Sequence, residues 1–264
     1  MRVISVLNFK GGTGKTSVVL GLGHAIAQAG YDVLILDGDR QRNTTWTLLG
    51  QDMTPTLSDV MTGKCQMADA IRESRENLYV VPSDTDLEKV GTYLKDHRKS
   101  YYTIAKQLET LDPQPYMVLI DHPGAFSTVM EALLLASHEM LIPCELEPYS
   151  VQGLFDMFRK LQDELEDHTL SNSGIIPYNA NFTRGMTKQY INELREEFGE
   201  LVLDVVNTDV NVSYAQSEQL TIFEYETKHK IRSRAAADFR RLAERFLPVE
   251  ETVKIKALEV PGEQ

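Results

Sequence analysis

The sequence predicts an α/β fold in which a mostly parallel, twisted sheet carries helices on both of its faces. Three observations support this prediction. Short apolar runs alternate with segments of helical periodicity, a glycine-rich loop separates the first run from the first helix, and two runs end in an aspartate. Nearly continuous apolar runs are typical of parallel strands buried on both faces. Their alternation with helices favours a sheet that is covered on both sides.

The elements follow one another along the chain. Strands are expected at residues 3–7, 32–37, 77–81, 116–121, 139–143, 174–178 and 201–206, and helices at 17–29, 44–49, 57–61, 67–72, 84–97, 101–111, 127–137 and from about 150 to 167. The last of these helices has apolar residues at helical spacing, which predicts one buried stripe. Residues 228–245 are expected to form a single basic helix. No repeat or linker divides the chain.

The size and composition of the chain bound its class. It has 264 residues, 42% hydrophobic and 25% charged, so we expect one domain over residues 1–248 and a tail over 249–264. Cys65 and Cys144 provide neither a disulfide framework nor metal-ligand spacing, which favours a reducing, cytoplasmic setting. The N-terminus does not read as a signal peptide, and no apolar run approaches the roughly 18–20 residues that span a bilayer. The net charge of −12 argues against nucleic acid over the whole surface but allows a local basic patch.

The glycine-rich loop between the first strand and the first helix predicts a phosphate-binding site. Its glycines allow backbone N–H groups to point at phosphate oxygens, and the helix that follows directs its positive end at them. In such a loop Lys15 would reach the terminal phosphates and the Thr16 hydroxyl would bind Mg²⁺. The predicted nucleotide contacts are Gly11, Gly12, Thr13, Gly14, Lys15, Thr16 and Ser17.

Acidic residues follow two of the predicted strands. The run 32–37 ends at Asp37 and leads into Asp39, and the run 116–121 ends at Asp121. The carboxyl ends of parallel strands form the edge at which α/β sheets bind ligands. Four apolar residues before Asp121 match a Walker B strand, whose carboxylate holds Mg²⁺, usually through water.

Lys10 gives the loop a more specific character. The string KGGTGKT resembles the deviant Walker A box of the ParA/MinD family, closest to the ParA/Soj-type partition ATPases. In that family the early lysine crosses a dimer interface to the partner's nucleotide. The segment DGDRQRN resembles the family's D-x-D-P-Q-x-N box with Arg40 in place of proline, and DHPG resembles its D-x-P-G segment. The resemblance covers about residues 1–248. Arg40 and Arg42 add two cations to the box, either solvated or in contact with nucleotide, partner or DNA.

The resemblance implies roles for several residues. Asp39 would position or activate the attacking water, and Asp37 would help Thr16 and Asp121 to organise Mg²⁺. Lys10 and Lys15 would join Asp39 as catalytic residues. The ends of the strands at 174–178 and 201–206 carry the family's adenine pocket, which makes Asn179 and Asp209 candidates there. Ordinary turn residues are the alternative for both.

The C-terminal segment concentrates positive charge. Residues 228–245 hold seven basic residues against Asp238 and Glu244. This fits contacts to phosphates that do not read sequence. By resemblance, Arg232-Ser233-Arg234 aligns with a basic position used for nonspecific DNA binding, although Asn211 stands where the family often has an arginine. The predicted DNA contacts are Lys230, Arg232, Arg234 and Arg241. The alternative is an amphipathic helix with a solvated basic face.

Taken together, the resemblance implies an ATPase with ATP and Mg²⁺ as cofactors. Two copies would close face to face across the nucleotides and expose a basic surface to nonspecific DNA. Hydrolysis, slow by itself and stimulated by a ParB-like or cargo-adaptor protein, would release them. The expected outcome is the positioning of plasmid or chromosome DNA, or of another cargo, by a cytoplasmic, nucleoid-associated protein.

Three alternatives belong to other classes. A small-molecule kinase would need an acceptor pocket. A nitrogenase-reductase-like electron carrier would need a cluster-ligating cysteine pair, and neither Cys65 nor Cys144 stands just after the Walker B segment. A MinD-like regulator would need an amphipathic basic tail, which residues 249–264 do not resemble, so we expect no membrane binding.

Overall fold

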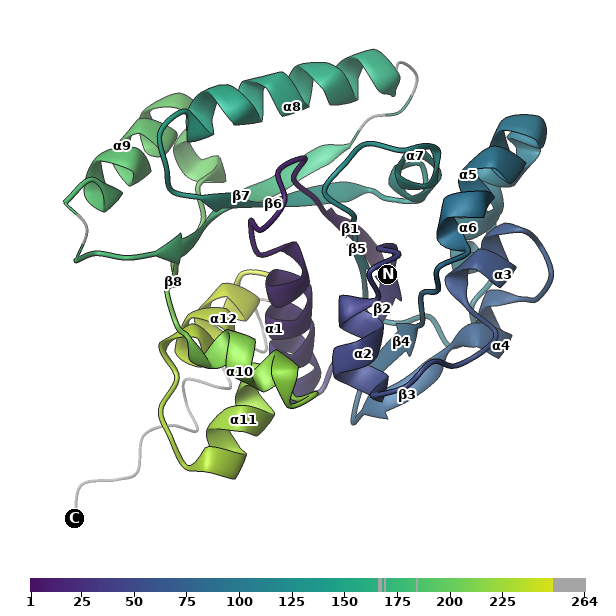
Figure 1. Cartoon of the computed structure of the whole chain (residues 1–264), viewed down its shortest axis with the longest axis horizontal. Coiled ribbons are helices and arrows are strands. Elements are labelled where there is room, and N and C mark those ends of the chain that lie inside the picture. Colours follow the sequence, from purple (N-terminus) through teal and green to yellow (C-terminus); the bar gives the residue numbers. More distant parts are fainter. Residues whose placement is uncertain (166–167, 169, 184, 249–264) are drawn as a thin grey trace.

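The computed structural model describes residues 1–165, 168, 170–183 and 185–248, which are built around one eight-stranded sheet (Figure 1). The strands are β1 (Arg2–Val6), β2 (Val33–Asp37), β3 (Arg72–Arg75), β4 (Leu78–Val81), β5 (Met117–Asp121), β6 (Glu139–Glu145), β7 (Ser171–Ala180) and β8 (Val206–Asn207). Their order is β3-β4-β2-β5-β1-β6-β7-β8. All neighbours pair in parallel except β3 and β4, which are antiparallel. The predicted α/β class is therefore confirmed.

Helices cover both faces of the sheet (Figure 1). One face carries α1 (Lys15–Gln28), α2 (Asn43–Leu49), α10 (Asn211–Ser217), α11 (Ile222–His229) and α12 (Arg234–Glu244). The other carries α3 (Leu57–Met61), α4 (Met67–Ala70), α5 (Leu87–Asp96), α6 (Thr103–Glu109), α7 (Thr128–Leu134), α8 (Ser150–Glu164) and α9 (Thr187–Phe198). None of the helices in the described ranges is long and apolar enough to cross a membrane.

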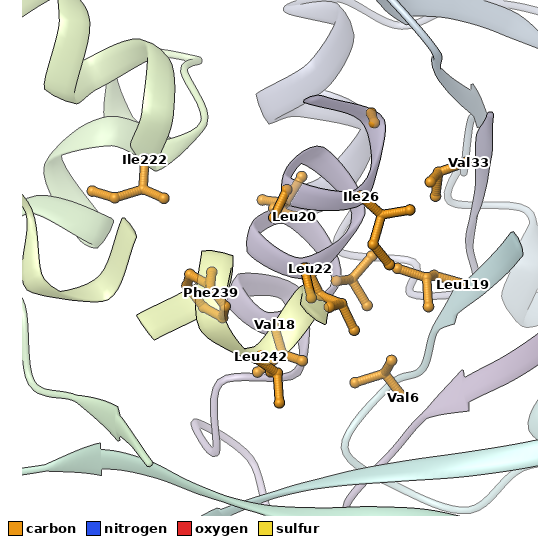
Figure 2. Close-up of a cluster of buried hydrophobic side chains, with 14 of the residues drawn as sticks. Val6, Val18, Leu20, Leu22, Ile26, Val33, Leu119, Ile222, Phe239 and Leu242 are labelled. Carbon is orange, nitrogen blue, oxygen red and sulfur yellow. The ribbon is translucent and has the colours of Figure 1, made fainter. Parts of the chain in front are cut away.

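Helix α1 lies between the sheet and the C-terminal helices (Figure 2). Its apolar side chains contact Val6 and Leu119 of the sheet on one side and Phe239 of α12 on the other. At Gly21 a Cβ atom would lie 2.4–2.6 Å from the Phe239 ring, so α1 and α12 pack in close contact only because no side chain intervenes. A helix that is buried nearly all round is apolar on every side, and this burial fixes the loop that precedes it.

The sheet differs from expectation at both edges. The helix expected at 67–72 ends at Ala70, and β3 follows as an antiparallel edge strand with only charged and hydroxyl side chains. An edge strand that is not buried on both faces lacks the apolar run that identifies central strands. At the other edge β8 covers only Val206–Asn207, although Val202 forms an isolated parallel bridge with Ile175.

The prediction of one continuous basic helix over 228–245 is wrong. Helix α11 ends at His229, Lys230 adopts a left-handed conformation with φ 52°, and α12 begins after Ser233. The Ser233 hydroxyl accepts a hydrogen bond from Ala236 N, which is the ordinary N-cap interaction of serine. The break contains neither glycine nor proline, so the serine at the N-cap position is the sequence feature that indicates a helix start here. The tail at 249–264 and residues 166–167 lie outside the described residues.

Candidate functional site

The glycine loop leaves the carboxyl end of β1 and enters α1 in a conformation that its own residues maintain. Gly12 and Gly14 have φ values of 77° and 88°, which favour glycine. Lys10 N donates to Asn8 Oδ1 at 2.9 Å, and Thr13 Oγ1 donates to the Lys10 carbonyl at 3.3 Å. A Cβ at position 14 would also lie 2.2–2.6 Å from the Tyr178 ring of β7.

Lys15 places its ammonium inside this loop. Its Nζ donates to the Lys10 carbonyl at 3.1 Å, and the residue is only 8% exposed. Burial lowers the pKa of Lys15, while the carboxylates of Asp121 and Asp39 oppose the shift. A Cβ at Gly124 would lie 3.7 Å from Lys15 Nζ, so the segment after β5 approaches the loop closely. A buried ammonium at a helix N-terminus suits a polyphosphate.

Asp37 and Asp121 lie side by side at the ends of adjacent strands. They are register partners in the β2–β5 pair, and both are buried. Burial raises the pKa of Asp37, and the neighbouring Asp121 raises it further. Burial likewise raises the pKa of Asp121, against hydrogen bonds from threonine hydroxyls. Two buried carboxyl groups this close favour a proton or a cation between them.

Three threonines hold these carboxylates in place. Thr16 Oγ1 and Thr44 Oγ1 each donate to Asp121 Oδ2 at 2.8 Å. Asp37 Oδ2 accepts from Thr45 N and Thr45 Oγ1 at 2.7 and 2.6 Å. Thr44 and Thr45 were not among the residues predicted for this site. The available signal was a pair of hydroxyl residues directly after the acidic box, at the start of a helix.

The donor set at this edge fits a magnesium ion. Asp121 Oδ1 is buried and has no hydrogen-bond partner in the part of the chain that the structure describes. Thr16 gives its hydrogen to Asp121, so its oxygen lone pairs remain available. The described residues contain no cluster of three or more His, Cys, Asp or Glu ligands. Mg²⁺ suits such a site because it prefers oxygen ligands and usually keeps waters and substrate phosphates among them.

Asp39 differs from the two buried carboxylates because it is partly exposed to solvent. Its Oδ1 accepts from Gln41 N at 2.9 Å, and its carbonyl accepts from Ser83 Oγ at 2.9 Å. Asp39 lines a cavity of about 480 Å³ together with Gly38, Pro123 and residues of α5 and α7. The neighbouring cations are paired: Arg40 with Glu88 at 2.9 Å, and Arg42 with Asp52. Asp39 is therefore the carboxylate that water can reach.

The Lys10 side chain points away from its own loop. It forms an ion pair with Glu147, which precedes α8, and 52% of the side chain is exposed. An exposed ion pair contributes little stability, typically below about 1 kcal/mol. Lys10 can therefore exchange this partner for another anion at low cost.

The chain matches known proteins over most of its length. The family model described as an AAA domain matches residues 1–175. A ParA family protein of Chlamydia muridarum is 32% identical over 255 residues, which cover 94% of this chain and 98% of that protein. The chain belongs to the ParA/MinD family of ATPases. The chromosome partitioning protein ParA of Caulobacter vibrioides is 30% identical over 238 residues, or 86% of this chain and 88% of that one.

Solved structures share the fold. McdA of Cyanothece in complex with ATP has a TM-score of 0.80 at 22% identity, over 93% of this chain and 96% of that one. Cobyrinic acid a,c-diamide synthase of Mycobacterium smegmatis, with a bound ATP analogue and magnesium, has a TM-score of 0.77 at 22% identity. That match covers 92% of this chain and 93% of that one. At this identity the likeness concerns the fold alone.

In this ParA/MinD-family chain His122 occupies a buried position behind the site. Burial, with a contribution from the Lys15 charge, lowers the pKa of His122 to about 3. Its Nε2 lies 2.7 Å from Ser5 Oγ, and its Nδ1 has no partner among the described residues. His122 is thus neutral near pH 7, and its hydrogen bond is to Ser5 of β1 in the core rather than to the phosphate loop.

The two adenine-pocket candidates lie at the ends of β7 and β8, in different hydrogen-bonding situations. Asn179 Nδ2 donates to Glu145 Oε1 at 3.2 Å, and the side chain is exposed. Asp209 accepts from Ser233 Oγ at 2.7 Å and from Asn211 at 2.7 Å. The Asp209 carboxylate is therefore already engaged in joining α10 to α12, whereas the exposed Asn179 side chain donates one hydrogen bond, to Glu145.

The basic residues of the C-terminal segment, which include the predicted DNA contacts, fall into two groups. Arg241 lies 3.5 Å from Asp238 on its own helix, and Arg240 and Arg245 pair with Glu226 and Asp204. Lys230, Arg232 and Arg234 are exposed and form no ion pair with any described residue. We call these three residues the basic loop. They flank the break between α11 and α12, where the sequence predicts a continuous helix.

Proposed function

We propose that this chain is an ATPase that binds ATP and Mg²⁺ at the edge formed by the glycine loop and the ends of β2 and β5. The observation that carries the proposal is the convergence of Lys15, Thr16 and the unpartnered Asp121 Oδ1, with the water-accessible Asp39 beside them. The ATP and magnesium complexes of proteins that share the fold support the choice of ligands.

Each residue has a distinct role in this proposal. The loop amides and Lys15 hold the phosphates, and Thr16 and Asp121 hold the metal. Asp37, held by hydrogen bonds from Thr45, adds a negative charge beside the metal. When bound, Mg²⁺ neutralises charge on the phosphate oxygens. Asp39 orients the attacking water from the cavity that it lines. Catalysis of this kind rests on positioning and electrostatic stabilisation, and slow basal turnover is expected.

Lys10 makes the ATP-bound state dimeric in this proposal. Its exposed ammonium leaves Glu147 and reaches the phosphates bound by a second copy, whose Lys10 does the same in return. The closed dimer then presents two copies of the basic loop, Lys230, Arg232 and Arg234, to the phosphates of nonspecific DNA. A ParB-like or cargo-adaptor protein stimulates hydrolysis and release. The outcome is the positioning of DNA or of another cargo at the nucleoid.

Two measurements test the proposal. DNA retention should be high with ATP and Mg²⁺ and low with ADP or without nucleotide. Lys10→Ala should abolish ATP-dependent dimerisation in light scattering while nucleotide binding persists. Unchanged dimerisation of Lys10→Ala would contradict the role of Lys10, and equal DNA retention in all nucleotide states would contradict the switch.

The cavity of about 480 Å³ beside Asp39 favours one alternative. A metabolic enzyme of the same fold could hold a small-molecule acceptor there and transfer a phosphoryl group to it, as a kinase does. Such an enzyme would produce a phosphorylated acceptor, whereas the ATPase produces only ADP and phosphate. Product analysis with cell metabolite fractions distinguishes the two.

A further inference from the structure

Arg75, on the edge strand β3, joins helix α2 to helix α11. Its Nε and Nη2 donate to the two carboxylate oxygens of Glu224 at 2.7 and 3.2 Å. Its Nη1 donates to the Leu48 carbonyl, near the end of α2, at 2.6 Å. The side chains of Arg75 and Glu224 are only 20% and 29% exposed. A bidentate, partly buried arginine–carboxylate pair fixes geometry far better than a surface ion pair.

The other end of α2 holds the carboxylates of the nucleotide site. Thr44 donates to Asp121, and Thr45 donates to Asp37. Helix α2 has seven residues, so it spans only about 10 Å. One short, rigid helix therefore contacts the metal-binding carboxylates at its start and Arg75 at its end.

On the far side of Arg75, helix α11 leads to the basic loop. The Glu224 carboxylate also accepts from Thr221 N at 2.8 Å, within the capping box of α11. Two residues further along α11, Glu226 accepts from Ser233 N at 2.8 Å and from Arg240 at 2.9 Å. Glu226 thus anchors the start of α12, and α11 connects Glu224 to the residues that flank Lys230, Arg232 and Arg234.

We infer that Arg75 is a positioning residue that couples the nucleotide site to the basic loop through α2 and α11. The inference rests on the proposed function. A metal and phosphates at Thr16 and Asp121 change the hydrogen bonds available to Thr44. Helix α2 adjusts, and the Leu48 carbonyl, Arg75 and Glu224 move as one unit. Such coupling requires that both sites bias the same connected element, which here is α2 with Arg75.

The test compares DNA affinity with ATP and with ADP. In the wild-type protein the ratio of the two should lie in the range of about 5–150, as is typical of coupled sites. In Arg75→Lys it should fall several-fold, toward the smaller ratio that dimerisation alone supplies, because lysine keeps the charge but lacks the fork that reaches Leu48 and Glu224 together. ATP binding and ATP-dependent dimerisation should persist in this variant, which separates the coupling from dimer formation.

A double-mutant cycle and a matched control sharpen the test. Glu224→Gln alone, and together with Arg75→Lys, should give the same reduced ratio as Arg75→Lys, because all three remove one link. Arg2→Lys is the control. Arg2 forks Glu139 of β6 at 2.8 and 2.7 Å and links neither α2 nor α11 through these bonds, so this variant should keep the wild-type ratio.

Two results would overturn the inference. A wild-type ratio in a folded Arg75→Lys variant would assign the ATP dependence to dimerisation alone. A ratio of one in the wild-type protein itself would overturn the proposed function as well, so the two failures are distinguishable. Should Arg75→Lys not fold, hydrogen exchange of the wild-type protein decides. ATP and Mg²⁺ without DNA should slow the amides of α11, and unchanged exchange there would overturn the coupling.

Discussion

The nucleotide edge and the C-terminal basic segment both carry functional charges, but the fold treats them in opposite ways. At the edge, Asp37 and Asp121 are buried, and the register of two adjacent strands places them together. In the basic segment the charges are exposed, and acids from elsewhere in the chain, such as Asp204 and Glu218, neutralise several of them. Position at a strand end therefore predicts which acids the fold brings together, whereas a count of charges overestimates how many are free.

Removing the buried ammonium should have the largest effect. Lys15→Ala deletes the charge that the loop holds 3.1 Å from the Lys10 carbonyl, and we expect ATP turnover to fall on the order of 100- to 1,000-fold. Lys160→Ala is a suitable control, because Lys160 lies over the Phe9 and Phe126 rings instead. Steady-state ATPase assays measure both variants. If ATP turnover of Lys15→Ala stayed within about tenfold of wild type, the buried ammonium would not be essential at the nucleotide edge.

Paired and unpaired arginines should differ at the exposed end. Arg232→Glu with Arg234→Glu removes two unpaired cations, and we expect DNA affinity to fall on the order of 100-fold near 0.1 M salt, with a shallower salt dependence. Arg241→Glu with Arg245→Glu changes the net charge equally but affects paired residues, so its effect should be smaller. Filter binding at several salt concentrations measures both. Equal losses would mean that total charge matters and pairing does not.

The contact between the two regions can be tested at α1. Gly21→Ala places a methyl group against the Phe239 ring of α12, and we expect it to reduce the free energy of unfolding by about 1–3 kcal/mol. At Gly23 a Cβ would lie 3.2 Å from Ile35 Cδ1, which a small adjustment of a side-chain end relieves, so Gly23→Ala should cost less. Denaturant unfolding compares the two. Equal free energies of unfolding for the two variants would show that α12 can shift to accommodate a methyl group on α1.

The smallest expected effect is a dependence of stability on pH. Burial raises the pKa of Asp37 and Asp121, so the folded chain binds these protons more tightly than the unfolded chain. Their contribution to the free energy of unfolding is therefore present at acidic pH and is lost as pH rises through the raised pKa values. Without Mg²⁺ and nucleotide, Asp37→Asn should flatten this dependence between mildly acidic and neutral pH. Asp163→Asn, on the exposed side of α8, should not.

The sequence by itself determined the class of the sheet and the placement of its glycine loop and acidic strand ends. Central strands can be recognised in the sequence because a strand buried on both faces is a nearly continuous apolar run. Leu34 of β2 and Leu119 of β5 are buried residues of such runs. Parallel pairing then brings the ends of β2 and β5 to one edge, so Asp37 and Asp121 could be expected to lie near Thr16. The structure confirms this placement, because Asp37 and Asp121 are register partners and Thr16 donates to Asp121, while the roles assigned to these residues stay predictions.

Only the tertiary structure decided which charges are paired and which helices are joined. The ion pair of Arg75 with Glu224 spans 149 positions in sequence, and neither residue carries a local signal of the other. The same holds for Thr44 and Thr45, whose role depends on where α2 begins relative to β2 and β5. Local periodicity reports burial and secondary structure, but contacts between distant side chains depend on packing, which a single sequence does not display.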